Sequence, residues 1–404
     1  MLSRRHSLAV LGSASAAGLL PGTIPFVLAA PSTDRRLVVV ILRGAIDGLA
    51  AIPPYGDPAY RTQRGKLALD APGADSGTLD LDGHFGLHPS LKPLHDMYRN
   101  RELVAFHAIA TPYRKRSHFD GQDLLENGTA SPNGVRDGWL NRALSLFEGG
   151  DRRIGLAVGQ TVPLILRGET PVQSWMPRAL RRADDDFLTR LSGLYQQDPL
   201  LGPAMAEAIG AQEMSDEVLG RDMGKKGKKL RGAGALPNLA KNVSKLLRHD
   251  RGARIAVLEV GGWDTHANQG VLTGRLARNL SALAAGVDEL KAGLGPIWSK
   301  SAVLVVSEFG RTVRPNGTNG TDHGTGGIAL LAGGAVAGGK VVTKWPGLSD
   351  GSLYEGRDLA PTRDLRSVLK AVAVDHLGLP ADAVEQRVFP DSTVAARDRR
   401  LIRA

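Results

Sequence analysis

Runs of apolar residues recur along the chain and predict buried β-strands. The runs cover residues 37–42, 103–108, 154–158, 255–260, 302–306 and 328–331. Apolar residues fill these runs almost continuously instead of alternating with polar ones, so both faces of each strand are expected to be covered. Burial on both faces is typical of parallel sheets that lie between layers of helices.

Helical patterns separate the predicted strands, most clearly at residues 271–294 and 362–377. The second pattern ends at Gly378 and Pro380, residue types that commonly terminate helices. An order of strand, helix and strand predicts a doubly wound α/β domain with a mostly parallel sheet flanked by helices.

One region departs from this order. Residues 171–251 contain no clear strand pattern, and helical patterns occupy 178–195 and 236–248. We therefore expect a single domain over residues 30–404, with a helical insertion at about 171–251. The insertion either covers the functional site or packs at the periphery.

The N-terminus has the features of a twin-arginine export signal over residues 1–29. Arg4 and Arg5 precede an apolar run at 8–20, and small residues end at Ala29. The run is too short for a membrane span, and no other run is long enough to cross a bilayer. We expect a periplasmic or secreted protein that uses the twin-arginine translocation machinery and has no stable membrane span after signal removal.

The composition excludes cysteine chemistry and favours an anionic substrate over nucleic acid. The 404 residues include no cysteine, which rules out disulfides, thiolate metal ligands and a cysteine nucleophile. The formal charge of +10 favours an anionic substrate. Part of that charge lies in a lysine-rich run at 225–231, which has no interleaved aromatic residues to stack on bases, so nucleic acid is not an expected partner.

Acidic and histidine residues follow the predicted strands, where ligands of open α/β sheets bind. Carboxylates and imidazoles are ligands of divalent metal ions. The candidate metal ligands are Asp47, Asp264, His266, Glu308, Asp322 and His323. In any single loop, such residues could instead be turn residues that bond their own backbone.

Ser117 follows the predicted strand 103–108 at the start of an expected helix. It is either a nucleophile activated by a metal ion or a helix-capping residue. Arg116, Arg311 or Arg43 could bind the oxygens of an anionic ester, because a guanidinium matches phosphate and sulfate geometry.

Five segments of the chain resemble the marker segments of an exported bacterial family, the domain of unknown function numbered fifteen-zero-one. They lie at residues 41–49, 116–120, 261–266, 307–312 and 321–324. That family is grouped with the alkaline phosphatase and sulfatase superfamily, so the resemblance implies an alkaline phosphatase-like fold over roughly residues 37–390.

The resemblance also implies roles for individual residues. In that superfamily, one or two metal ions and a hydroxyl or modified cysteine nucleophile transfer phosphate and sulfate groups. By position, Ser117 resembles the nucleophile. The residues that resemble the metal ligands of the superfamily are Asp47, Asp264, His266, Glu308 and His323. Only one residue separates Asp264 from His266, whereas the superfamily has three residues between the corresponding ligands. The superfamily also has an adjacent Asp-His pair directly after the later strand, whereas here Asp322 and His323 lie further along the chain. The number of ions therefore stays open.

Together these features predict an exported metal-dependent hydrolase of phosphate or sulfate esters that acts through Ser117 or a water molecule. Mixed imidazole and carboxylate ligands favour zinc or manganese as the divalent cofactor. The alternative is a non-catalytic envelope or surface binding protein that retains the superfamily fold.

Overall fold

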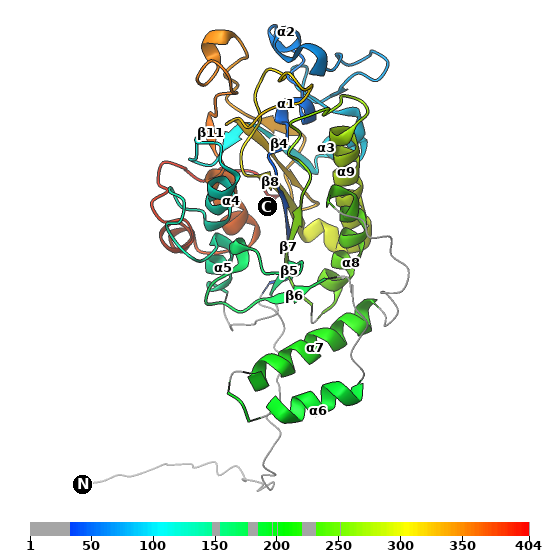
Figure 1. Ribbon diagram of the computed structural model, residues 1–404, viewed down its shortest axis with the longest axis vertical. Coiled ribbons are helices and arrows are strands. Elements are labelled where there is room, and N and C mark those ends of the chain that lie inside the picture. Colours follow the sequence, from blue (N-terminus) through cyan, green and yellow to red (C-terminus); the bar gives the residue numbers. More distant parts are fainter. Residues whose placement is uncertain are drawn as a thin grey trace, which may run out of the picture.

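The computed structural model describes residues 33–147, 154–176, 185–195, 197–199, 201–219, 232–250 and 252–403. The predicted export signal and the lysine-rich run at 225–231 lie outside these residues. Figure 1 shows a central sheet with helices on both sides and two further helices projecting from one end.

A mixed sheet of nine strands forms the centre of the fold, in the order β10-β4-β9-β8-β1-β7-β5-β6, with β11 also paired to β4. All strand pairs in it are parallel except those of β9, which runs antiparallel to β4 and β8. The strands are β1 (Arg36–Leu42), β4 (Leu103–Ala110), β5 (Gly155–Val158), β6 (Gln173–Trp175), β7 (Ile255–Val260), β8 (Ser301–Ser307), β9 (Gly327–Ala332), β10 (Lys340–Val342) and β11 (Arg363–Asp364). A separate two-stranded sheet pairs β2 (Leu79–Asp80) with β3 (Gly86–Leu87).

The strands are buried on both faces, as their continuous apolar runs predicted. Every residue of β1 is buried. Val38, Val40 and Leu42 pack into one apolar cluster, and the alternate residues Leu37, Val39 and Ile41 pack into the other. Because successive side chains of a strand point to opposite faces, each strand contributes to both cores.

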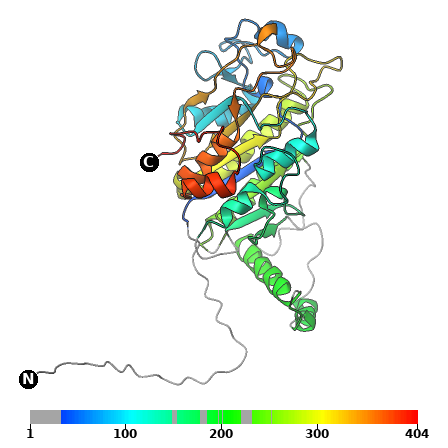
Figure 2. The same cartoon turned by 90° about the vertical axis from the view of Figure 1, so that its left-hand side faces the viewer.

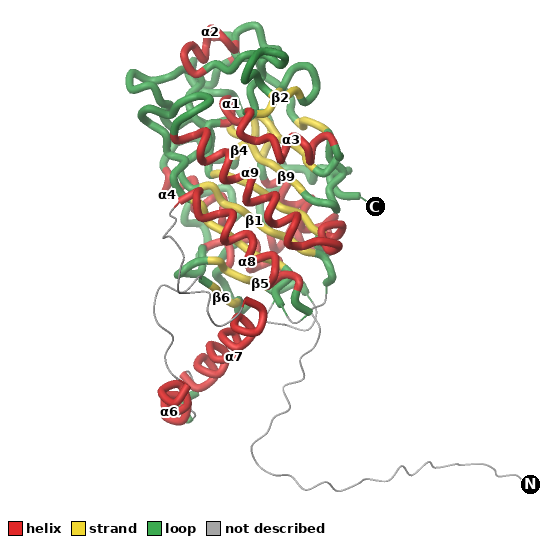
Figure 3. The backbone as a smooth tube through the Cα atoms, turned by 90° about the vertical axis from the view of Figure 1, so that its right-hand side faces the viewer, coloured by secondary structure: helices red, strands yellow, loops and turns green. Residues whose placement is uncertain are grey.

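Helices cover both faces of the sheet. Residues of α3, α8 and α9 line one apolar cluster, and residues of α4, α5 and α10 line the other; Figures 2 and 3 show the two faces. The helices are α1 (Gly48–Ala51), α2 (Tyr60–Arg64), α3 (Lys92–Arg99), α4 (His118–Asn127), α5 (Trp139–Leu144), α6 (Asp185–Tyr195), α7 (Leu201–Leu219), α8 (Leu236–Arg248), α9 (Arg275–Leu294), α10 (Arg366–Ala371) and α11 (Ala381–Ala383). The predicted doubly wound, mostly parallel α/β fold is confirmed.

The region from 171 to 251 differs from its prediction in one element. The short strand β6 pairs in parallel with β5 at the edge of the sheet, where the sequence predicted no strand. The prediction that this region has no strand was wrong. The three residues Gln-Ser-Trp are too few to show a strand period in the sequence, and only their pairing with β5 defines the strand. Further along, α6 and α7 project from this edge, whereas α8 packs against the sheet with its apolar side (Figure 3).

A second difference concerns the predicted helix at 362–377. Its first residues form β11, and the α-helix begins only at Arg366, whose backbone amide donates to Asp364 Oδ1 at 2.9 Å. The helix continues as a π-helical segment over Val372–His376. No helix in the described ranges combines the length and apolarity that crossing a membrane requires.

Candidate metal centre

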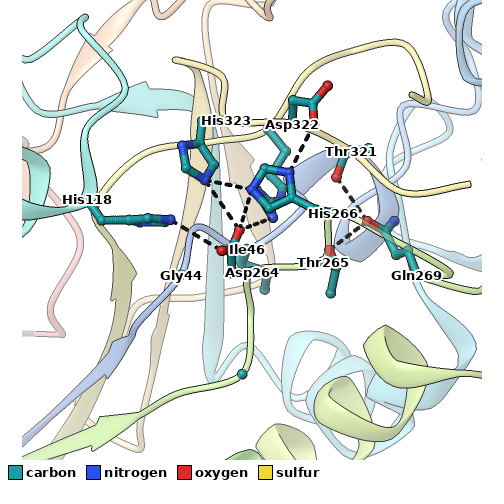
Figure 4. Close-up of polar contacts among 12 residues, drawn as sticks. Gly44, Ile46, His118, Asp264, Thr265, His266, Gln269, Thr321, Asp322 and His323 are labelled. Carbon is teal, nitrogen blue, oxygen red and sulfur yellow. Dashed lines mark hydrogen bonds and ion pairs between the residues drawn. The ribbon is translucent and has the colours of Figure 1, made fainter. Parts of the chain in front are cut away.

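The topology brings four loops to one edge of the sheet: those after β1, β4 and β7, and the loop that joins β8 to β9. Strands β1, β4, β7 and β8 all run in one direction, so their carboxyl ends meet at this edge. Strand β9 runs in the opposite direction, and the loop before it, which carries Asp322 and His323, therefore lies at the same edge. Figure 4 shows side chains from these loops in contact.

Backbone contacts fold the loop between β8 and β9 onto itself and bring the loop after β1 against the loop after β7. Arg311 and His323 form an isolated antiparallel bridge, and the amide of Gly324 donates to the carbonyl of Gly310 at 2.8 Å. Gly44 lies between two other loops with φ +115°, and a Cβ at this position would be 2.6 Å from the Asp264 nitrogen. Only glycine fits there without displacing Asp264.

Three imidazole rings are each held at Nδ1 by an oxygen acceptor. His118 faces Glu308 Oε1 at 2.8 Å, His266 faces Asp322 Oδ1 at 2.9 Å, and His323 faces the carbonyl of Arg116 at 3.0 Å. With its proton at Nδ1, each ring presents the lone pair of Nε2. Metal-binding histidines typically have this arrangement, in which the ring nitrogen that does not bind the metal donates its proton to an oxygen.

The three Nε2 atoms turn toward one carboxylate. Asp264 Oδ1 lies 3.0 Å from His266 Nε2 and 3.3 Å from His323 Nε2, and these two nitrogens are 2.9 Å apart. His118 Nε2 lies 3.7 Å from Asp264 Oδ2. The candidate ligand atoms of His118, Asp264 and His323 all lie within 4.8 Å of one another.

These distances and donors fit a divalent ion. In a tetrahedral site with bonds of 2.0–2.1 Å, ligand atoms lie about 3.3 Å apart, close to the separations among Asp264, His266 and His323. The buried Nε2 of His118 has no hydrogen-bond partner among the described residues. Three nitrogens and a carboxylate suit zinc or manganese better than calcium.

Glu308 is fully buried and holds the His118 side of the site. Its Oε1 accepts from His118, from the amide of Gly44 at 2.8 Å and from Gln122 at 3.1 Å. Burial alone would raise its pKa, but these hydrogen bonds outweigh that effect and lower the pKa to about 2. The carboxylate is therefore ionised throughout the physiological range.

The same contacts and burial shift the pKa values of His118, His323 and Asp322. The hydrogen bond to Glu308 raises the pKa of His118, against the effect of burial. Burial, with His118 nearby, lowers the pKa of His323. Burial would raise the pKa of Asp322, but hydrogen bonds from Asn316 and His266 lower it. Without metal, His118 therefore stays protonated to a higher pH than a free imidazole does, and the carboxylates of Glu308 and Asp322 are ionised.

Arg311 supplies a buried positive charge beside these groups. Its side chain is 0% exposed and its Nη2 donates to Asp264 Oδ1 at 2.5 Å. Its Nε and Nη1 have no hydrogen-bond partner within the described ranges, and burial lowers its pKa. Because the guanidinium is buried, it acts on the candidate metal centre as a fixed positive charge.

Ser117 occupies the N-cap position of α4, directly before His118. Its hydroxyl makes no capping hydrogen bond, although its amide donates to the hydroxyl of Tyr113 at 3.1 Å. The preceding residue, Arg116, has a left-handed backbone with φ +65°. Ser117 is therefore at the edge of the histidine cluster, with a side chain that the helix does not use.

The guanidinium of Arg116 is already paired. It donates to Asp358 at 2.7 Å and to Glu355 at 2.6 Å, and Asp358 is fully buried. Its carbonyl, and not its charge, contacts the site, through His323. Arg43, a further arginine considered for ester binding, is paired with Glu126 at 2.7 Å and with Glu259.

The predicted ligands thus fall into three groups. Asp264, His266 and His323 lie together, whereas Glu308 and Asp322 contact imidazole Nδ1 atoms. Asp47 lies apart from this cluster and pairs with Arg64 at 2.6 Å. Sequence reasoning assigned no role to His118; its place next to Ser117 in the segment 116–120 was the available signal.

A family model described as "Protein of unknown function (DUF1501)" matches residues 100–388. No curated protein matches the chain.

Several crystal structures are similar at low identity. The C-terminal periplasmic domain of EptC from Escherichia coli, in complex with Zn, is 12% identical, with 90% of this chain and 89% of that chain covered and a TM-score of 0.35. A protein in the alkaline phosphatase superfamily from Vibrio parahaemolyticus is 12% identical, with 75% and 62% covered and a TM-score of 0.35. Phosphonate monoester hydrolase of Agrobacterium radiobacter is 10% identical, with 86% and 74% covered and a TM-score of 0.36. At this level of similarity, no residue role or activity is transferred to this chain.

Proposed function

The chain belongs to the DUF1501 family of proteins of unknown function, as its sequence motifs indicated, and we propose that it is a metal-dependent hydrolase of phosphate or sulfate esters. We also propose that it works in the periplasm or outside the cell after export by the twin-arginine translocation machinery. The export proposal rests on the sequence of residues 1–29.

Three imidazoles that turn Nε2 toward one carboxylate support this function more than any other feature. His118, His266, His323 and Asp264 would hold the ion. The side chains of Asp264 and His266 are 43% and 44% exposed, so a substrate can reach them from solvent. Zinc or manganese suits this donor set.

A divalent ion bound there would supply a Lewis acid, which lowers the pKa of a hydroxyl group or a water molecule and neutralises ester oxygens. The protein's own groups complete the site. Arg311, buried directly behind Asp264, would supply a fixed positive charge that stabilises the oxygens of the ester. Asp264 holds that guanidinium in place through the hydrogen bond from Nη2.

Ser117 is the nucleophile in this proposal. Its hydroxyl is free of capping bonds, and its neighbours His118 and Arg116 both contact the histidine cluster. Its position at the N-terminus of α4 also favours the negative charge that builds on an attacking oxygen. A water molecule at the same site is the alternative attacking group.

Metal content and ester turnover of the purified full-length protein test the proposal. We expect bound zinc or manganese that is lost in Asp264→Ala/His266→Ala and retained in the matched control His95→Ala/Asp96→Ala on α3. We also expect hydrolysis of 4-nitrophenyl phosphate or sulfate that requires the metal. Ser117→Ala should keep the metal and lose turnover if Ser117 attacks, and keep both if a water molecule attacks.

A wild type that folds but takes up neither zinc nor manganese would refute the metal-dependent function. A loaded wild type that turns over no phosphate or sulfate ester would instead favour a non-catalytic envelope protein with a structural ion.

A further inference from the structure

Asp47 lies at the end of β1 with both carboxylate oxygens already bonded. Oδ1 accepts from the amide of Ala50 at 3.2 Å. Oδ2 accepts from Arg64 Nη2 at 2.6 Å and from Gln269 Nε2 at 2.7 Å. Asp47 is 1% exposed, so these donors, and not solvent, surround its charge.

Arg64 is held beside Asp47 by backbone carbonyls. Its side chain is 0% exposed, and its Nη1 donates to the carbonyl of Val313 at 2.9 Å and to that of Thr312 at 3.4 Å. A guanidinium stays charged in proteins, so Arg64 neutralises Asp47 permanently. A divalent ion on Asp47 would be repelled by this buried cation, and such repulsion is strongest away from water.

Gln269 connects Asp47 to two of the segments that carry the candidate ligands, 264–266 and 321–323. It is fully buried, and its Oε1 accepts from Thr265 Oγ1 at 2.7 Å and from Thr321 Oγ1 at 3.0 Å. Thr265 lies between Asp264 and His266, and Thr321 directly precedes Asp322. Figure 4 shows the hydrogen bonds from both threonines meeting at the side chain of Gln269. The amide is thus oriented by donors on one side and an acceptor on the other.

From this network we propose that the site holds one metal ion, and that Asp47, Arg64 and Gln269 position the ligand loops instead of binding a second ion. The inference rests on the metal centre of the proposed function and fixes its stoichiometry. Asp47 is then a positioning residue, which acts on Asp264, His266 and His323 through Gln269.

Zinc binding to the purified full-length protein tests the inference, with stoichiometry from mass spectrometry and affinity from calorimetry. We expect one equivalent in the wild type. The double variant Asp47→Asn/Arg64→Gln removes both buried charges together and avoids leaving one unpaired. It should still bind one equivalent, with an affinity about 10- to 100-fold lower, the usual effect of losing an outer-shell partner.

Gln269→Met tests the connection itself and should lower zinc affinity by a similar factor without changing the stoichiometry. Gln173→Met is the matched control, because Gln173 is also a buried glutamine but lies on the edge strand β6; its affinity should equal that of the wild type. Two equivalents in the wild type would overturn the single-ion inference, and loss of an equivalent from the Asp47→Asn/Arg64→Gln variant at saturating zinc would overturn the positioning role of Asp47. Either result would leave the proposed function intact. A wild type with no zinc would refute both.

Discussion

Glu308→Gln should separate the contribution of charge from that of shape in the candidate site. The carboxylate is 0% exposed and accepts three hydrogen bonds at Oε1, from Gly44, His118 and Gln122. Glutamine has nearly the same shape, and its amide oxygen can accept the same three bonds. In the wild type, Glu308 Oε2 faces Ser307 Oγ at 2.9 Å as an acceptor. The NH₂ group of glutamine can donate to that hydroxyl instead, because the hydroxyl can direct its own proton to the carbonyl of Leu42. The substitution therefore removes mainly the negative charge.

The pKa of Glu308 gives the size of the effect. Its ordinary value of 4.5 falls to about 2 in the folded protein, which corresponds to about 3 kcal/mol of stabilisation of the ionised form. The raised pKa of His118 reflects the same hydrogen bond and is not added. At pH 7, Glu308→Gln should lower the free energy of unfolding of the metal-free protein by about 3 kcal/mol.

The pH dependence has a definite sign. A depressed carboxylate pKa stabilises the fold above the unfolded-state value of about 4.5, and this contribution is lost as pH falls toward 2. The difference between wild type and Glu308→Gln should therefore shrink below pH 5, and it should also decrease as pH rises through the raised pKa of His118, where the partner of Glu308 loses its charge.

Urea unfolding of chelator-treated protein, followed by tryptophan fluorescence, measures this difference. Glu355→Gln is the control, because Glu355 is an exposed partner of Arg116 and exposed ion pairs contribute little to stability. Glu308→Gln should also weaken zinc binding by about 10- to 100-fold, since it loosens His118. Equal unfolding curves for Glu308→Gln and Glu355→Gln, with unchanged zinc affinity, would refute the reasoning.

Three further outcomes are expected. Zinc affinity should fall as pH drops below the raised pKa of His118, because the ion competes with the proton; calorimetry at several pH values should show this dependence weakened in His118→Gln. Arg311→Met should raise KM for an ester about 10- to 100-fold at unchanged zinc stoichiometry, and an unchanged KM in steady-state kinetics would exclude its role in ester binding. Removing zinc with a chelator should lower the Tm, since zinc at 100 times its Kd adds about 2.7 kcal/mol of stability. A Tm that is the same with and without zinc would contradict a zinc site in the folded protein.

The strands were predictable because their signal is local. A strand buried on both faces needs apolar residues at nearly every position, and β1, β4, β7 and β8 occur where such runs stand. The loops that follow them were predictable for the same reason. The edge strand β6 was missed because its three residues are defined by pairing with β5 and carry no period of their own.

The roles of individual acids could not be predicted from the same patterns. Asp47 and Asp264 both follow buried strands, and sequence reasoning placed both in the metal site. Arg64 and Gln269 surround Asp47, whereas three imidazoles face Asp264. These partners come from distant segments, for example Gln269 at 222 positions from Asp47.

The sequence by itself determined the alternation of strands and helices, the burial of the sheet, the absence of cysteine chemistry and the loops in which acids and histidines gather. Those features depend on residue type and spacing along a few turns or strand positions. Only the tertiary structure decided that His118 joins His266 and His323 while Asp47 pairs with Arg64. The physical reason is that a side chain's role depends on the charges and donors within a few ångström, and here the fold draws them from loops far apart in the chain.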